Sequence, residues 1–242
     1  MPKDQAWKLR DLIPERELYP HIKSDFHTKR LAITSGKGGV GKSVIALNLA
    51  LLFAKEEQKT LLVDGDINLS KIQILTDTSP QFTYTDVKRG GKKLSEVIFE
   101  YQPYCSILPT GSGALELINY RDEIAQHFKN QFKKLDGRFD YMLVDTASGI
   151  SRLVFGELPS CDEVMIIATP EPTSIADAYA IFKILSYYYP QIPVHIVINL
   201  VDSESEAIEA YQKFNLIVQK FLYRRINYLG FLLRDENVVQ SI

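Results

Sequence analysis

Short apolar runs alternate with amphipathic segments along most of the chain. The apolar runs have the length of buried strands and lie at residues 31–35, 60–63, 105–108, 141–144, 164–168 and 194–198. The segments with apolar positions at helical spacing lie at residues 43–55, 119–134, 174–189 and 205–222. Apolar strands separated by helices are typical of a parallel sheet that is covered on both sides. The pattern therefore predicts an α/β fold: a mostly parallel, twisted sheet with helices on both faces.

Two stretches do not follow this alternation. Residues 1–29 contain Pro14 and Pro20, and only a short helix from Asp4 to the first proline is expected there. We therefore divide the chain into a leader, residues 1–29, in which a helix is followed by a linker, and one domain, residues 30–242. Residues 76–93 are rich in Thr, Gly and Lys, which predicts a surface excursion.

Composition and charge narrow the functional classes. The chain has 242 residues, of which 45% are hydrophobic and 24% charged, which is enough apolar material for a substantial core. Lys and Arg number 28 against 30 Asp and Glu, so there is no global basic field and no nucleic-acid partner is expected. Cys105 and Cys161 lack the spacing of a metal site or a disulfide framework. The polar start and the lack of a long apolar run predict a cytoplasmic protein.

The strongest chemical signal lies between the first predicted strand and the first predicted helix. The eight residues there satisfy the P-loop pattern G-x-x-x-x-G-K-[ST], whose backbone N–H groups cradle phosphate oxygens at a helix N-terminus. Lys42 should reach the β- and γ-phosphates as a catalytic cation, and the Ser43 hydroxyl should ligate Mg²⁺. We expect nucleotide contacts along the whole motif: Gly36, Lys37, Gly38, Gly39, Val40, Gly41, Lys42 and Ser43.

Carboxylates follow two of the other predicted strands. Asp64 and Asp66 come at the end of the second strand, and Asp145 directly follows residues 141–144. Open α/β sheets bind ligands at the carboxyl ends of their strands. We expect Asp145 to hold Mg²⁺ through a water, as a Walker B aspartate does. The plain alternative for Asp64 and Asp66 is that they cap a helix or lie in a loop.

The loop resembles the deviant Walker A motif of the MinD/ParA ATPases, because Lys37 directly follows the first glycine. The resemblance implies ATP or ADP as the nucleotide and an ATP-sandwich homodimer in which Lys37 reaches the phosphates of the partner. It also implies that Asp66 orients the attacking water, that Asp64 lies near the Mg²⁺ shell, and that Asn199 reads the adenine edge. The alternative for Lys37 is an exposed loop lysine.

Two further segments resemble the FlhG (FleN/YlxH) proteins, the flagellar-number branch of this class. One is Thr169-Pro170-Glu171-Pro172-Thr173-Ser174-Ile175-Ala176-Asp177. The other is the leader segment Asp4-Gln5-Ala6-Trp7-Lys8-Leu9-Arg10, which matches the motif DQAxxLR. The first resemblance implies that Asp177 lies near the dimer interface, whereas the alternative is a carboxylate favoured in the first turn of a helix. Residues 229–235 are similar to the family's loop beside the base.

The leader motif implies a partner. In FlhG proteins this segment stimulates the GTPase FlhF, and the residues that would contact it here are Asp4, Gln5, Ala6, Leu9 and Arg10. The alternative is that the leader helix packs on its own domain. Flagellar switch-complex proteins and a flagellar transcription regulator are further partners of the family. The family's amphipathic membrane tail would begin near Ile242, so recruitment to the inner membrane face is expected only where such a tail follows.

The sequence therefore predicts a slowly hydrolysing ATPase that acts as a dimerisation switch and regulates flagellar number or placement. The first alternative is a MinD- or ParA-type positioning or partition ATPase that acts on a membrane or DNA cargo. The formal net charge of −2 argues against DNA as that cargo. The second alternative is an interaction module with a degenerate nucleotide site, which is disfavoured by the intact Lys42, Ser43, Asp66 and Asp145.

Overall fold

The computed structural model describes residues 28–66, 71–110, 130–149 and 161–240. The elements in chain order are β1 (Lys29–Thr34), α2 (Lys42–Lys55), β2 (Thr60–Gly65), α3 (Lys71–Leu75), α4 (Tyr84–Lys88), α5 (Leu94–Val97), β3 (Phe99–Gln102), β4 (Cys105–Pro109), β5 (Tyr141–Thr146), β6 (Glu163–Ala168), α9 (Pro172–Tyr188), β7 (Val194–Val201), α10 (Glu204–Leu222), β8 (Asn227–Leu233) and α11 (Glu236–Gln240).

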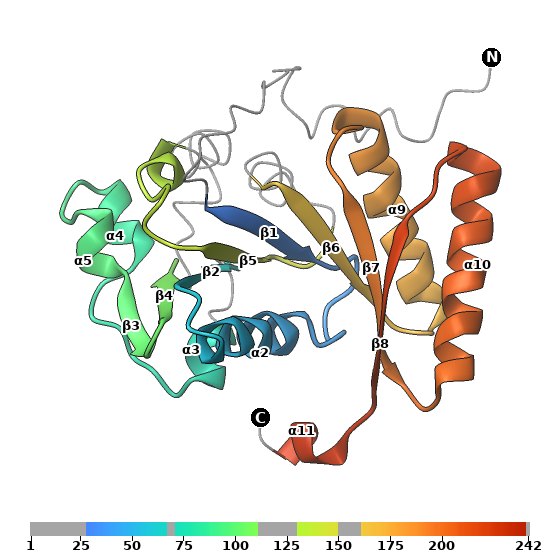
Figure 1. Ribbon diagram of the computed structural model, residues 1–242, viewed down its shortest axis with the longest axis horizontal. Helices are drawn as coiled ribbons and strands as arrows, with labels where there is room; N and C mark the ends of the chain where they lie inside the picture. Colours follow the sequence, from blue (N-terminus) through green and yellow to red (C-terminus); the bar gives the residue numbers. More distant parts are fainter. Residues whose placement is uncertain (1–27, 67–70, 111–129, 150–160, 241–242) are drawn as a thin grey trace.

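These strands form one eight-stranded sheet in the order β3-β4-β2-β5-β1-β6-β7-β8 (Figure 1). Every neighbouring pair is parallel except β3 and β4, which form an antiparallel hairpin at one edge. The helix α2 lies on one face, and α9 and α10 lie on the other. The predicted fold class is confirmed.

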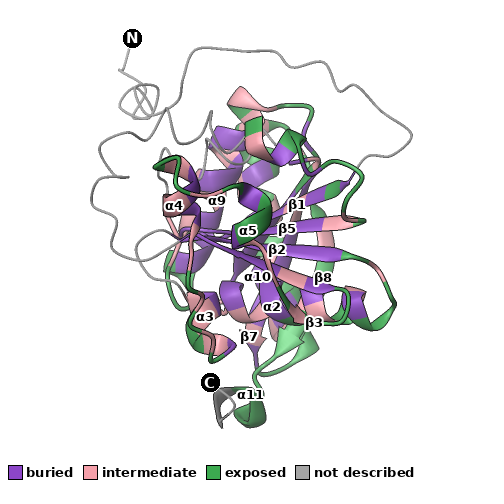
Figure 2. Ribbon diagram, turned by 90° about the vertical axis from the view of Figure 1, so that its left-hand side faces the viewer, coloured by how far each residue is buried: buried purple, intermediate pink, exposed green. Residues whose placement is uncertain are grey.

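Two apolar layers hold the helices to the sheet. Successive residues of a strand point to opposite faces, so Ala32 packs with the α9 and α10 side chains while Ile33 packs with those of α2. The central strands are consequently buried over nearly their whole length (Figure 2). The stripe of α2 that meets the sheet uses small residues, Ala46 and Ala50, both fully buried, which lets this helix lie close to β2 and β5.

The register of the central strands brings the predicted site together. Asp64 on β2 lies opposite Asp145 on β5, and Asp145 lies opposite Ile33 on β1. Because the three strands run parallel, the loop that follows β1 emerges at the same edge as both carboxylates. This edge is where the P-loop motif begins.

The structure corrects two expectations about local elements. The stretch 76–93 is not only a surface excursion, because it contains α4, whose Tyr84 is completely buried in the core. A capping box starts this short helix: the Thr83 N–H donates to Asp86 Oδ2 at 2.8 Å. Residues 229–233, expected in a loop, belong to β8, the edge strand beside β7. Its exposed apolar side chains do not give the pattern of a buried strand.

Two other predicted segments are described only in part. β1 begins at Lys29, so the last residue of the predicted leader belongs to the sheet, while residues 1–27 lie outside the described residues. The five predicted FlhF contacts fall in that range. Of the predicted helix 119–134, the structure describes residues 130–133 as helical. No helix in the described ranges has both the length and the apolar character needed to cross a membrane.

Candidate nucleotide site

Two glycines give the loop between β1 and α2 its shape. Gly39 and Gly41 have φ angles of 79° and 84°, a left-handed conformation that residues with a Cβ rarely adopt. Gly41 directly precedes the 14-residue helix α2, so the first N–H groups of the helix face the hollow of the loop. Partial positive charge at this helix end favours an anion such as phosphate.

Close packing against α9 and β7 holds the loop in place. A Cβ on Gly36 would collide with the backbone of Asp177 in α9, and a Cβ on Gly41 would collide with the Asn199 amide. Asn199 is buried, and its Nδ2 donates to the Val40 carbonyl at 2.8 Å. Asp177 and Asn199 therefore both support the loop. The dimer contact of Asp177 and the adenine contact of Asn199 stay predictions.

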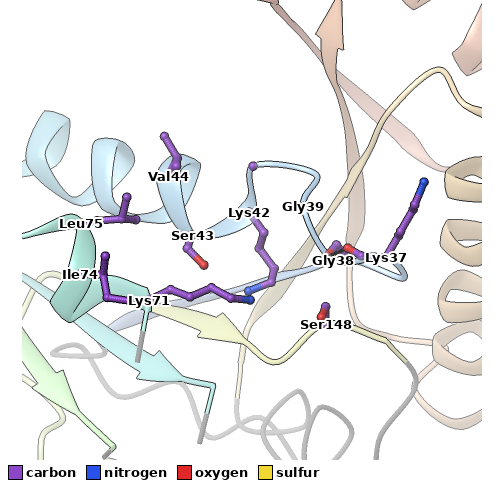
Figure 3. A pocket seen from close by; sticks show the side chains of 12 residues that line it. Lys37, Gly38, Gly39, Lys42, Ser43, Val44, Lys71, Ile74, Leu75 and Ser148 are labelled. Carbon is purple, nitrogen blue, oxygen red and sulfur yellow. Dashed lines mark hydrogen bonds between the residues drawn. The ribbon is translucent and has the colours of Figure 1, made fainter. Parts of the chain in front are cut away.

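A cavity of about 320 Å³ lies between the loop and the short helix α3 (Figure 3). A volume at the lower end of the range for ligand pockets suits the phosphate end of a nucleotide, while Asn199 lies outside the lining. The lining residues are Ser35, Lys37, Gly38, Gly39, Gly41, Lys42, Ser43, Val44, Lys71, Ile74, Leu75 and Ser148.

The three lysines of the lining each form an ion pair with an acidic residue of the same chain. Lys42 pairs with Asp145, and both side chains are almost completely buried. Lys37 pairs with Glu171 of the β6–α9 turn, and these two side chains are 41% and 59% exposed. The third lysine, Lys71 at the start of α3, has its Nζ 3.1 Å from Asp66 Oδ2. Each lysine charge of the lining is thus balanced by a carboxylate of the same chain.

The two lysines of the loop point in opposite directions. Lys42 extends into the cavity, whereas Lys37 extends away from it toward the exposed side of the molecule (Figure 3). The nitrogen of Lys37 therefore does not meet the groups that surround Lys42.

Asp64 and Asp145 form a buried acidic pair beside the loop. Burial, together with the negative charge of Asp145, raises the pKa of Asp64 from its ordinary value of 3.8 to about 7. One carboxylate oxygen of each residue, Oδ2, is buried without a hydrogen-bond partner. Buried acceptors without a donor fit a divalent cation. Such a cation would give both oxygens a partner and would offset the repulsion between the two carboxylates.

The donor set around this pair suits Mg²⁺ in particular. Within the described ranges no three His, Cys, Asp or Glu side chains are grouped so that they could hold a metal ion. Mg²⁺ requires no such cage, because it keeps several waters and takes the rest of its ligands from one or two carboxylates and substrate phosphates. Asp64, Asp145 and the Ser43 hydroxyl at the cavity wall are the residues that could hold it.

The structure also adds residues that the sequence reasoning missed. Lys71 forms an ion pair with Asp66, and Glu171 forms one with Lys37. Ser148 lies against Gly38 across the cavity. Glu171 stood within a recognised segment, but its contact depends on a fold that brings β6 next to β1. Lys71 follows Asp66 by only five residues. A lysine so soon after a strand-end carboxylate was the signal from which this ion pair could have been predicted.

Comparisons with known proteins agree with this geometry. A family model described as an AAA domain matches residues 28–196. The Antiactivator FleN of Pseudomonas aeruginosa is 30% identical over 212 residues, which cover 88% of this chain and 76% of FleN. The Flagellum site-determining protein YlxH of Helicobacter pylori is 32% identical over 230 residues, which cover 94% and 77%.

Solved structures agree on the fold. The septum site-determining protein MinD of Pyrococcus horikoshii, complexed with Mg-ADP, superposes with a TM-score of 0.74 at 22% identity, over 88% of this chain and 84% of that one. The alignments with FleN and YlxH cover most of this chain and most of each relative. The geometry of the P-loop fits an ATPase of the same family. The chain therefore belongs to the MinD/ParA family of P-loop ATPases, together with the flagellar proteins FleN and YlxH.

Proposed function

We propose that this protein is an ATP-dependent dimerisation switch that binds ATP with Mg²⁺ at the P-loop and hydrolyses it slowly. The opposite directions of the two loop lysines carry the proposal. Lys42 is buried at its own cavity, whereas the half-exposed Lys37 points away from it. A cation at the rim of its own cavity that points away from it is suited to the phosphates of a second protomer, as an arginine finger is in other NTPases.

The residues around the cavity have separable roles in this proposal. Lys42 would exchange Asp145 for the β- and γ-phosphates of a bound nucleotide, and Asp145, Asp64 and Ser43 would hold Mg²⁺. Mg²⁺ would supply charge neutralisation to the phosphates. Asp66 orients the attacking water. This exchange would replace one ion pair by another, so Lys42 and Asp145 would keep charged partners throughout.

The cellular role is proposed from the relatives and the leader. FleN is named an antiactivator and YlxH a flagellum site-determining protein. We place this chain in the cytoplasm, in control of flagellar number or placement, with FlhF as the partner of residues 4–10. A peptide of residues 1–14 should then stimulate GTP hydrolysis by FlhF. A chain without these residues should bind ATP but should not stimulate GTP hydrolysis by FlhF.

Light scattering after size exclusion tests the switch directly. The protein should elute as a monomer with ADP and as a dimer with Mg²⁺ and a non-hydrolysable ATP analogue. Lys37→Ala should bind the analogue and remain monomeric, because only the trans-acting charge is lost. A Lys37→Ala protein that dimerises like wild type would overturn the proposal. DNA retention that falls steeply with salt would instead favour a partition ATPase.

A further inference from the structure

Lys71 is the charged residue on the α3 side of the cavity, opposite the P-loop. Its side chain extends from the start of α3 across the cavity in the direction of Lys42 (Figure 3). Its Nζ lies 3.1 Å from Asp66 Oδ2, and the Asp66 N–H donates to Asp64 Oδ1 at 3.3 Å. The ammonium group therefore sits at the carboxyl end of β2, beside the acidic pair that fits a metal ion.

The two members of the Lys71–Asp66 pair differ in their freedom to move. The Asp66 side chain is only 6% exposed, whereas that of Lys71 is 36% exposed. A lysine has a long flexible stem, so its ammonium can leave one acceptor for another within reach, while a buried carboxylate at a strand end cannot follow. The ion pair can therefore be broken by movement of the lysine side chain.

An ATP molecule would bring one phosphate group more than ADP to this end of the cavity. Three lysines line the described cavity. Lys37 points away from it, and Lys42 belongs to the P-loop. Lys71 is the cation that remains on the opposite wall. A γ-phosphate is a stronger acceptor than one carboxylate oxygen because it carries more charge on three oxygens.

We propose that Lys71 is a γ-phosphate-sensing residue that acts within its own chain, exchanging Asp66 for the γ-phosphate when ATP binds. The exchange frees Asp66 from its ion pair with Lys71 only when ATP is present. Lys71 thereby links nucleotide identity to the orientation of the proposed water-positioning carboxylate. This inference rests on the proposed ATP site, but it predicts a binding preference that does not require Asp66 to be catalytic.

Calorimetric titration with ADP and with a non-hydrolysable ATP analogue, both with Mg²⁺, tests the assignment. Lys71→Met should weaken analogue binding about tenfold or more and leave ADP binding nearly unchanged, since a charge-assisted contact to the third phosphate is lost. Lys71→Arg should restore most of the preference. The matched control is Lys213→Met, which removes an exposed lysine paired with Glu209 on α10, the helix on the other face of the sheet from α2. Light scattering on the same samples separates loss of affinity from loss of dimers.

A double-mutant cycle with Asp66→Asn sharpens the test. If the ammonium is shared, Asp66→Asn should raise affinity for the analogue severalfold in the wild-type background, because Lys71 no longer leaves a partner. The same substitution should have no such effect beside Lys71→Met. The double variant also removes both charges of this ion pair, so it remains interpretable where Lys71→Met alone folds poorly.

Each outcome decides the matter. An analogue preference that survives in Lys71→Met, or an equal loss for both nucleotides, would overturn the γ-phosphate assignment and leave the proposed function standing. A wild-type chain that binds neither nucleotide would overturn both.

Discussion

At the scale of single residues, the Lys42–Asp145 pair couples nucleotide binding to stability. Lys42→Ala should weaken ATP binding at least about 100-fold, since the main side-chain cation for the phosphates is lost. It should also lower the free energy of unfolding by about 3–5 kcal/mol, because Asp145 is left as an unpaired buried charge. Calorimetry and urea denaturation measure the two effects. Adding Asp145→Asn should restore stability without restoring binding; recovery of both would contradict the P-loop role of Lys42.

Asp64 gives the protein a pH dependence of defined sign. Its pKa is raised from 3.8 to about 7, so the native state holds this proton more tightly than the unfolded chain does. The stability that it contributes is therefore fully present below about pH 3.8 and is lost as the pH rises to about 7. Asp64→Asn stays neutral, so the free energy of unfolding of the variant relative to wild type should rise across this window. Urea titrations without nucleotide or Mg²⁺ measure it.

A matched measurement with ligand tests the assignment of Asp64 to the metal site. Mg²⁺ and ADP should stabilise wild type more at pH 8 than at pH 5, because the ionised carboxylate is the form that binds a cation. The same addition should stabilise Asp64→Asn less, with a smaller dependence on pH. A constant difference between the two proteins at all pH values would show that Asp64 is not the group that titrates.

Sequence spacing predicted the positions of the candidate site residues where those positions depend on local structure, while the roles of these residues stay predictions. The P-loop spacing and the strand-end positions of Asp64, Asp66 and Asp145 place all of these groups at one edge of the sheet. The partners of the lysines could not be predicted in the same way. Glu171 reaches Lys37 only because β6 lies beside β1, a pairing between segments more than 130 residues apart.

At the scale of elements, the apolar runs predicted the central strands because both of their faces are buried. The pattern failed at the sheet edges, where β3 and β8 carry mixed or exposed side chains. It also failed for α4, a helix of five residues that is held by a capping box and the buried Tyr84, and is too short to show a helical period. Edge strands and single-turn helices are determined by tertiary packing, which a local pattern does not contain.

The β6–α9 turn restrains Lys37 and should set the threshold for dimerisation. Glu171→Gln removes its ion-pair partner, so less ATP should be needed to form dimers, by about two- to fivefold. The effect is small because the pair is exposed and such pairs contribute about 0.2–1 kcal/mol. Light scattering across an ATP-analogue titration measures the midpoint. Glu209→Gln breaks a comparable exposed pair on α10 and should leave the midpoint unchanged; an equal shift in both variants would point to net charge.

At the scale of the whole molecule, the proposed switch requires two chains to contribute to one site. Asp66→Ala should bind ATP and accumulate as a dimer, because the bound state forms but does not hydrolyse. Lys37→Ala should bind ATP without dimerising or hydrolysing, with a rate loss of up to roughly 10³–10⁵ by analogy with trans-acting cations.

Mixing the two variants distinguishes trans from cis action. In a heterodimer, the site that holds the intact Asp66 receives Lys37 from the Asp66→Ala chain, so it carries both groups and should regain part of the ATPase rate. The other site lacks both groups, so the regained rate should approach at most half of the wild-type rate per heterodimer. If Lys37 acted within its own chain, neither site would be complete and the mixture would stay inactive. ATP turnover against the mixing ratio measures this, and a flat curve at the level of the separate variants would reject the sandwich arrangement.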